Sequence, residues 1–248
     1  DLEATTSQGL TLAAAYESGA WVASRNGQRA LAEGWAARAE ALIGTGQDAE
    51  SIRIRDGVLH LKWTLAREDG KLRLAERLAE DALVNARSAP PEIRAITIGR
   101  ALQRRGTIRT DLGDFAGAEE DLVEALALTE QSYGRDDYRS LRMQMALGWY
   151  YTAAGDAVRG RAMLDAVGPE LMRVYGERSQ TVGNYHFNLA NAELALGHQA
   201  AARDGYLRAA QIYEQSGAGK TSYVGSAMWN AASIEIDLEL AHLERRLA

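Results

Sequence analysis

The sequence contains no cysteine, which excludes disulfide frameworks, cysteine nucleophiles and thiolate metal sites. Proline occurs three times and glycine 24 times, so collagen-like and proline-rich linker chains are excluded as well. No run approaches the roughly 20 consecutive apolar residues that a membrane helix needs, so this region is not expected to insert into a membrane. The chain opens on Asp1 without a basic segment followed by an apolar one. We therefore expect no targeting peptide and interpret the sequence as a segment of a longer protein.

No strong excess of either charge is present. The 28 lysines and arginines stand against 34 aspartates and glutamates, which gives a formal net charge of −6. An acidic chain is a poor binder of phosphate backbones, so no nucleic-acid partner is expected. Both signs are mixed along the whole length, as is typical of solvated helix faces. The absence of cysteine slightly favours an oxidising compartment, and we expect the periplasmic part of a membrane protein, with the cytoplasm as the alternative.

What the sequence does contain is an internal period. Five glycines lie 43, 43, 42 and 42 residues apart, namely Gly27, Gly70, Gly113, Gly155 and Gly197. Five positions after each glycine stands a small residue: Ala32, Ala75, Ala118, Gly160 and Ala202. Seven positions before each glycine the residue is again mostly small: Ala20, Trp63, Gly106, Gly148 and Ala190. A fixed period of this length is the signature of a solenoid built from repeated helical units.

Each unit has the pattern of two helices. After Gly113 the apolar residues step by three and four along one helical face: Phe115, Ala118, Leu122, Ala125 and Leu126. The glycine is expected where the first helix ends, because it adopts a left-handed cap conformation at little cost. Asp114 and Asp156 follow their glycines and are predicted helix N-caps. Pro169 falls inside the second helix of the fourth unit, which predicts a kink or break near residues 165–169.

The pattern resembles the tetratricopeptide repeat (TPR) in the 42-residue form of kinesin light chains. The resemblance is carried by three stretches: Met145-Ala146-Leu147-Gly148-Trp149-Tyr150-Tyr151 before Gly155-Asp156, Asn188-Leu189-Ala190 before Leu196-Gly197, and Leu112-Gly113-Asp114-Phe115-Ala116-Gly117-Ala118-Glu119. It implies an all-α fold, a right-handed α-solenoid of about five helix pairs in a single domain over residues 1–248. The repeats are clearer over 91–216 and divergent over 8–87. A further helix over 221–247 would be a solvating C-terminal cap.

The resemblance also implies a concave groove lined by the first helix of each pair. The groove positions map to Arg142, Met145, Trp149, Asn184, Phe187, Asn188, Asn191, Trp229 and Asn230. The asparagines would hydrogen-bond the backbone of an extended peptide, or else cap and pack helices locally. The aromatic residues would be binding anchors, or else part of the core between helices. Arg142 would clamp a carboxylate, or else form a surface ion pair.

The sequence supplies no catalytic or cofactor-binding set. No two of its four histidines stand three or four residues apart, so no metal site is expected. No Ser/His/Asp set and no G-x-S-x-G turn occur, which argues against an enzyme. The segment 216–221 ends like a phosphate-binding loop, but Glu214 occupies the place of its first glycine and a helix precedes it. We expect no nucleotide and no other cofactor.

The expected function is therefore recognition of a protein or peptide segment, or of a small ligand. Family analogy suggests the sensory or interaction module of a multidomain bacterial signalling protein, such as a serine/threonine kinase. The alternative is a passive scaffold or self-association module without a small ligand. That alternative predicts a homodimer and an apolar patch on an outer face or on the terminal helix.

Overall fold

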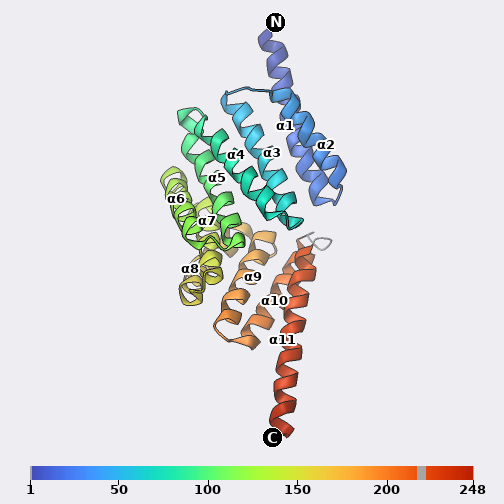
Figure 1. Cartoon of the computed structure of the whole chain (residues 1–248), viewed down its shortest axis with the longest axis vertical. Coiled ribbons are helices and arrows are strands. Elements are labelled where there is room, and N and C mark those ends of the chain that lie inside the picture. The colour runs from blue at the N-terminus through green and yellow to red at the C-terminus, as the bar shows by residue number, and fades with distance from the viewer. Residues whose placement is uncertain (1, 217–221, 248) are drawn as a thin grey trace. The chain divides into compact units, whose positions relative to one another are not determined.

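The computed structural model describes residues 2–216 and 222–247, and the described residues form 11 α-helices without a strand (Figure 1). The helices are α1 (Leu2–Arg25), α2 (Arg29–Ile43), α3 (Ala49–Glu68), α4 (Leu72–Arg87), α5 (Pro91–Leu112), α6 (Phe115–Tyr133), α7 (Tyr138–Ala153), α8 (Ala157–Tyr175), α9 (Gln180–Ala195), α10 (Gln199–Gln215) and α11 (Ser222–Leu247). The predicted all-α fold of consecutive helix pairs is confirmed, and the helix predicted over 221–247 is α11.

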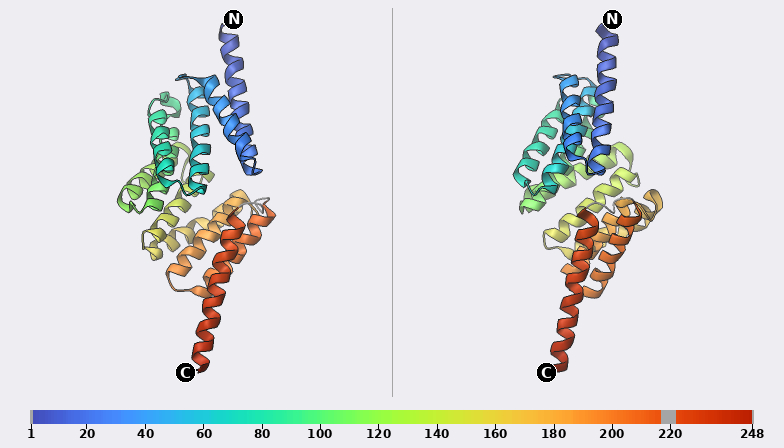
Figure 2. Two further views of the ribbon diagram at one scale, coloured as in Figure 1. Left: turned by 45° about the vertical axis from the view of Figure 1, so that its right-hand side comes forward. Right: turned by 90° about the vertical axis from the view of Figure 1, so that its right-hand side faces the viewer.

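The chain divides into two compact units, Asp1–Ser132 and Tyr133–Ala248. In the first unit α1 packs on α2, α2 on α3, α3 on α4 and α4 on α5. In the second unit α7 packs on α8, α8 on α9, α9 on α10 and α10 on α11, and the pairs are antiparallel (Figure 2). Contacts between consecutive helices are what a stack of helix pairs requires. The single domain over 1–248 stays a prediction.

All five periodic glycines lie in turns between the two helices of a pair. Each has a positive φ, with values of 71° at Gly27, 69° at Gly70, 82° at Gly113, 94° at Gly155 and 81° at Gly197. Residues with a side chain avoid this left-handed region, so glycine is required there. The two predicted caps are also confirmed. Carboxylate oxygens of Asp114 and Asp156 each accept a hydrogen bond at 3.1 Å from a backbone N–H three residues later.

The small repeated residues are the contact points between paired helices. The residues five after and seven before each glycine are all buried. In α5, a Cβ at Gly106 would lie 2.7 Å from Cγ of Leu122 in α6, and a Cβ at Gly148 in α7 would lie 2.9 Å from Cγ of Leu164 in α8. Small residues on one helix thus receive large residues of the other, which fills the interface at close interhelical distance.

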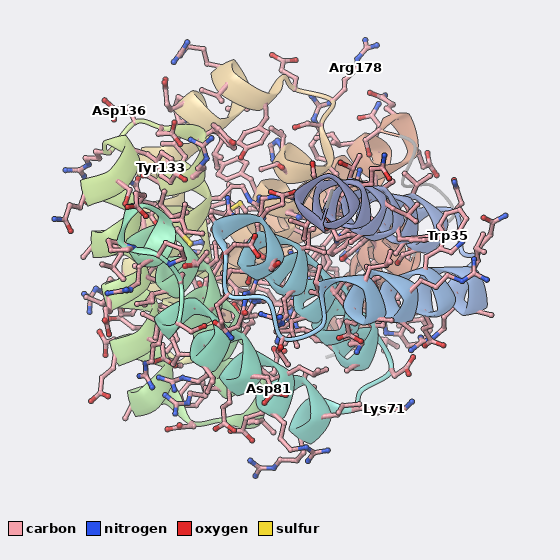
Figure 3. All side chains as sticks on the ribbon, turned by 90° about the horizontal axis from the view of Figure 1, so that it is seen from above. Trp35, Lys71, Asp81, Tyr133, Asp136 and Arg178 are labelled. Carbon is pink, nitrogen blue, oxygen red and sulfur yellow. The ribbon has the colours of Figure 1, made fainter. Side chains whose placement is uncertain are left out.

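The first pair shows the same packing with a larger side chain. Trp35 of α2, labelled in Figure 3, lies against Gly19 of α1, where a Cβ would be only 2.7 Å from its ring atom Cε3. The core around it is rich in alanine and continues into α3 through Ile54, Val58 and Leu61.

Of the kink or break predicted near residues 165–169, the break does not occur. Helix α8 runs without interruption from Ala157 to Tyr175 and includes Pro169. Proline cannot donate a hydrogen bond to the carbonyl of Asp165, but both residues are exposed, so water can satisfy that carbonyl. The neighbouring Gly168 is buried, and its Cα lies against the ring of Tyr185 from α9. Packing of this tyrosine on the helix outweighs the local preference for a break.

Candidate functional site

The nine predicted groove residues all belong to the second unit. They lie on the first helices of its pairs, α7 and α9, and on α11, which follows α10 in the stack. Since these helices carry the positions that the resemblance assigns to a concave face, we consider each residue by its contacts. The contacts divide the nine residues into those that pack between helices and those that face solvent.

Met145 and Phe187 make contacts inside their own helix pairs. Met145 of α7 is buried in a cluster that includes Leu164 and Val167 of α8. Phe187 of α9 is half-buried and packs edge-on against the ring of Tyr206 from α10, with 5.3 Å between the ring centroids. In both of these repeats, the residue ten positions before the periodic glycine therefore faces the second helix of its pair.

Two of the four asparagines hold buried tyrosines. Asn184 Oδ1 accepts a hydrogen bond from the Tyr213 hydroxyl at 2.8 Å, and Asn191 Oδ1 accepts one from the Tyr206 hydroxyl at 2.6 Å. Burial raises the pKa of both tyrosines, because an ionised phenol would lose its solvation. A buried hydroxyl needs a partner, and the asparagines supply it. Asn230 of α11 is a further hydrogen-bonding neighbour of Tyr206.

Asn188 differs from the other three asparagines. It is half-buried on α9, four residues after Asn184 and three before Asn191, so all three lie on one face of the helix. Within the described part of the chain its side chain has no hydrogen-bond partner. An amide offers donors and acceptors together, which is the combination that a peptide backbone requires.

Arg142 and Trp149 occupy the same side of α7, one helical turn on either side of Met145. Arg142 is exposed and Trp149 is half-buried. Burial raises the pKa of the neighbouring Tyr175 hydroxyl, while Arg142 acts in the opposite direction by charge and hydrogen bonding. Arg142 thus places a positive charge beside the aromatic residue that ends α8.

Trp229 is the most exposed of the large apolar side chains, at 74%. It stands 42 residues after Phe187, at the equivalent position of the repeat, but no helix follows α11 in the described chain. The role of α11 as a solvating cap stays a prediction. Met228, Ile236 and Leu240 are also largely exposed on this helix.

Sequence reasoning missed two arrangements of charged residues. Arg104 of α5 and Asp56 of α3 form a buried ion pair in the first unit, which only their charge at otherwise apolar positions could have suggested. In the second unit the guanidinium of Arg139 stacks on Tyr133 and Tyr138, 4.0 and 4.2 Å from the ring centroids.

The second of these arrangements lies next to a turn that recurs after 42 residues. The glycine series at Gly134 and Gly176 marks this turn before α7 and before α9, with φ values of 88° and 77°. Asp136 and Arg178, both labelled in Figure 3, are equivalent exposed residues of the two turns. Both turns thus have a glycine of positive φ, while the charge at the position two residues after that glycine changes sign.

The described residues also lack the features that a metal site or a membrane span would require. The described residues contain no group of histidines and carboxylates that could hold a metal ion. None of the described helices combines the length and the apolar character that crossing a membrane would take. The glycine-rich segment that ends like a phosphate-binding loop lies, from residue 217 to 221, outside the described residues.

Comparisons with known proteins place the fold. No family model and no curated protein matches the sequence. Two solved structures of nearly identical TPR-like repeats from a putative kinesin light chain of Podosopora anserina are similar, each with 16% identity over 84% of this chain and 97% of theirs. Their TM-scores are 0.56 for a single-residue variant and 0.54 for the other structure. BtubC (BKLC) from P. vanneervenii matches at a TM-score of 0.47, with 16% identity over 94% of this chain and 92% of that one.

This chain has a TPR-like repeat fold. The likeness to the kinesin light chain repeats extends over most of both chains, so it concerns the helix stack as a whole. At 16% identity the likeness concerns the fold, and the role of individual residues has to come from their contacts.

Proposed function

We propose that this chain is a protein-interaction module and that the face formed by α7, α9 and α11 binds an extended peptide segment of a partner protein. TPR-like stacks present concave surfaces suited to extended partners, which supports the general role. No catalytic chemistry is part of this proposal, because the chain carries no catalytic set and binding requires none.

The observation that carries the proposal is the unused amide of Asn188. Asn184 and Asn191 lie on the same helix face, and their side-chain oxygens accept hydrogen bonds from tyrosine hydroxyls. Asn188 has no such partner among the described residues and keeps both donor and acceptor. A peptide backbone passing over α9 can pair with both groups at once.

The chemistry of the face suggests which peptides it selects. Arg142 is the only charged residue among the nine, and it is exposed. A segment with an acidic side chain or a C-terminal carboxylate at that end would form a charge-assisted hydrogen bond. Trp149 lies two turns along α7 from Arg142 and offers an apolar contact for a side chain of the same segment.

A displayed library of random peptides tests the proposal, with the whole chain as immobilised target. We expect peptides selected on the wild type to bind Asn188→Ala about thirtyfold more weakly, since two hydrogen bonds worth about 1 kcal/mol each are lost. The melting temperature should not change, because Asn188 holds no other residue. Asn184→Ala is the contrasting variant and should lower the melting temperature by leaving the Tyr213 hydroxyl unpaired. Equal binding to wild type and Asn188→Ala would show that the face is wrongly assigned.

A sensory role in a bacterial signalling protein such as a serine/threonine kinase stays a prediction, because no feature of the sequence specifies an output domain. Self-association is the second candidate function. It is favoured by the exposed apolar residues of α11, among them Met228, Trp229 and Ile236.

A further inference from the structure

Helix α11 occupies the place of a first helix in a sixth pair, and within the described residues it has no second helix. It contains 26 residues and α10 contains 17. At 1.5 Å per residue these lengths are about 39 and 26 Å. The helix accordingly continues past the end of its neighbour (Figure 1 and Figure 2). Its exposed face can be compared directly with the same face of α9, where the second helix is present.

Helix α9 packs through two opposite faces. Towards α10, a Cβ at Gly183 would lie 2.6 Å from Tyr213, Phe187 packs on Tyr206, and Ala190 lies against Gly205. On the other side of the helix Tyr185, Leu189 and Ala192 join the core formed with α7 and α8. On the first face Gly183 thus receives the large Tyr213, while Ala190 meets the small Gly205.

Helix α11 repeats both faces 42 residues later. Ala227, Ala231 and Ile234 correspond to Tyr185, Leu189 and Ala192, and they pack against α10. Gly225, Trp229 and Ala232 correspond to Gly183, Phe187 and Ala190. This second set is exposed: nothing lies within 4 Å of a Cβ built at Gly225, and Trp229 is 74% exposed. Ile236 continues the same face and is 59% exposed.

We propose that a second copy of this chain occupies this face, with the two α11 helices antiparallel across a two-fold axis. In such a pair, residues whose numbers add to a constant face each other. A sum of 461 sets Trp229 of one copy against Ala232 of the other and Ile236 against Gly225. Each large residue of one copy then contacts a small residue of the other copy. Because of the two-fold axis, each of these two contacts occurs twice in the dimer.

The register agrees with the way this chain packs its own helices. Gly106 with Leu122, Gly148 with Leu164 and Gly183 with Tyr213 are all pairs of a small and a large residue between antiparallel helices. The proposed dimer continues that interface into a second copy. The four positions Gly225, Trp229, Ala232 and Ile236 alternate steps of four and three, as in an antiparallel coiled coil.

Charge and the alternative orientation support the same choice. The register places Glu235 against Ser226 and Met228 against Ser233, so no like charges oppose each other. A parallel pair in register would set Trp229 against Trp229 and Gly225 against Gly225. The two tryptophans would crowd the interface, and the two glycines would leave a void. The antiparallel pair avoids both.

Analytical ultracentrifugation of the whole chain tests the proposal. We expect the wild type to dimerise in the micromolar range and Trp229→Glu to weaken the dimer at least about tenfold, because a carboxylate would be buried without a partner. Val158→Glu is the matched control, since Val158 is 70% exposed on α8 and lies outside the face. The control should leave the dimer unchanged, and both variants should keep the helical content of the wild type.

An exchange of the large and the small residue tests the register. Ala232→Trp alone would set two tryptophans against each other and should weaken the dimer. Adding Trp229→Ala restores one large and one small residue in each layer, and dimerisation should return to within about threefold of the wild type. This rescue is expected of the proposed register and not of a general apolar patch.

The outcomes that overturn the proposal are distinct from those of the peptide experiment. A wild-type chain that stays monomeric at about 100 µM would leave the face to a helix of another protein and would refute the second copy. A dimer that tolerates Trp229→Glu, or that the exchanged pair does not restore, would place the interface elsewhere. Asn188 is not part of this face, so peptide binding can fail while the dimer persists.

Discussion

Single glycines decide how closely the helices of this chain approach each other. At Gly160 in α8, a Cβ would lie only 2.6 Å from the backbone carbonyl oxygen of Gly148 in α7. The other four units have alanine at this position, so the fourth pair is closer at this point than the repeat requires. A backbone atom cannot move aside as the end of a flexible side chain can, and the contact therefore depends on the glycine.

We expect Gly160→Ala to lower the free energy of unfolding by about 1–3 kcal/mol, since the added methyl group overpacks the contact. Gly34→Ala in α2 is the matched control, because nothing lies within 4 Å of a Cβ there. It should raise stability by about 0.5–1 kcal/mol through the better helix propensity of alanine. Urea unfolding measures both changes, and a Gly160→Ala variant as stable as the wild type would contradict the close approach.

The half-buried His186 makes stability depend on pH. Burial lowers the pKa of His186 below its usual value of 6.5, and the charge of Arg208 lowers it further. The unfolded chain consequently binds a proton more readily than the folded one, so stability falls as the pH drops below about 6.5. The loss is complete once the pH has passed below the pKa of the folded state.

Urea unfolding of wild type and His186→Gln between about pH 7.5 and about pH 5, a range that spans the usual histidine pKa, checks this effect. The wild type should lose more stability than the variant, because glutamine cannot take up the proton. His242→Gln on α11 serves as a control, since His242 is exposed. Equal losses in all three proteins would mean that His186 titrates normally in the folded state.

Among the helices, α8 shows how tertiary packing overrides a local signal. Gly168 and Pro169 together predict a break, yet the helix continues because Tyr185 of α9 fills the space beside the glycine. The proline then only leaves the carbonyl of Asp165 without its helical partner. Because Pro169 is exposed, its packing offsets little of this cost.

Replacing the proline should therefore stabilise the chain. We expect Pro169→Ala to raise the free energy of unfolding by about 1–3 kcal/mol, because the hydrogen bond to the carbonyl of Asp165 is restored. Gly168→Ala should have the opposite effect, since its methyl group would meet the ring of Tyr185. Thermal and urea unfolding measure both, and a Pro169→Ala variant less stable than the wild type would show that the proline has a role in the packing.

The stack as a whole should be least stable at its ends. In a repeat array each helix is stabilised by its neighbours, and among the described helices α1 and α11 are packed against neighbours on one side only. Helices such as α3, α4, α9 and α10 have neighbours on both sides. Local opening is therefore expected to begin at the two end helices.

Amide hydrogen exchange checks this order. At concentrations too low for dimers, α11 should exchange faster than α9 by at least about tenfold, because its opening costs less free energy. At high concentration the protection of α11 should increase if a second copy covers it, while that of α1 should not change. Protection of α11 equal to that of α9 in the monomer would contradict the end effect.

The positions of the five periodic glycines determined the fold, since a left-handed turn every 42 or 43 residues admits few chain paths. The sequence did not determine the use of the nine candidate residues. Asn184 and Asn191 have the residue type of a peptide-binding ladder, and the hydroxyls of Tyr213 and Tyr206 reach them from α10. That pairing joins residues 29 and 15 positions apart, and no local pattern encodes it.

The sequence by itself determined the helices, their pairing and the small residues at which they meet, because helical periodicity and turn conformation are local properties. Only the tertiary structure decided that α8 runs through its proline and that, among the described residues, nothing pairs with the Asn188 amide or covers Trp229. Each of these depends on which side chain of another helix reaches the position, and burial by a neighbour is not a local property of the chain.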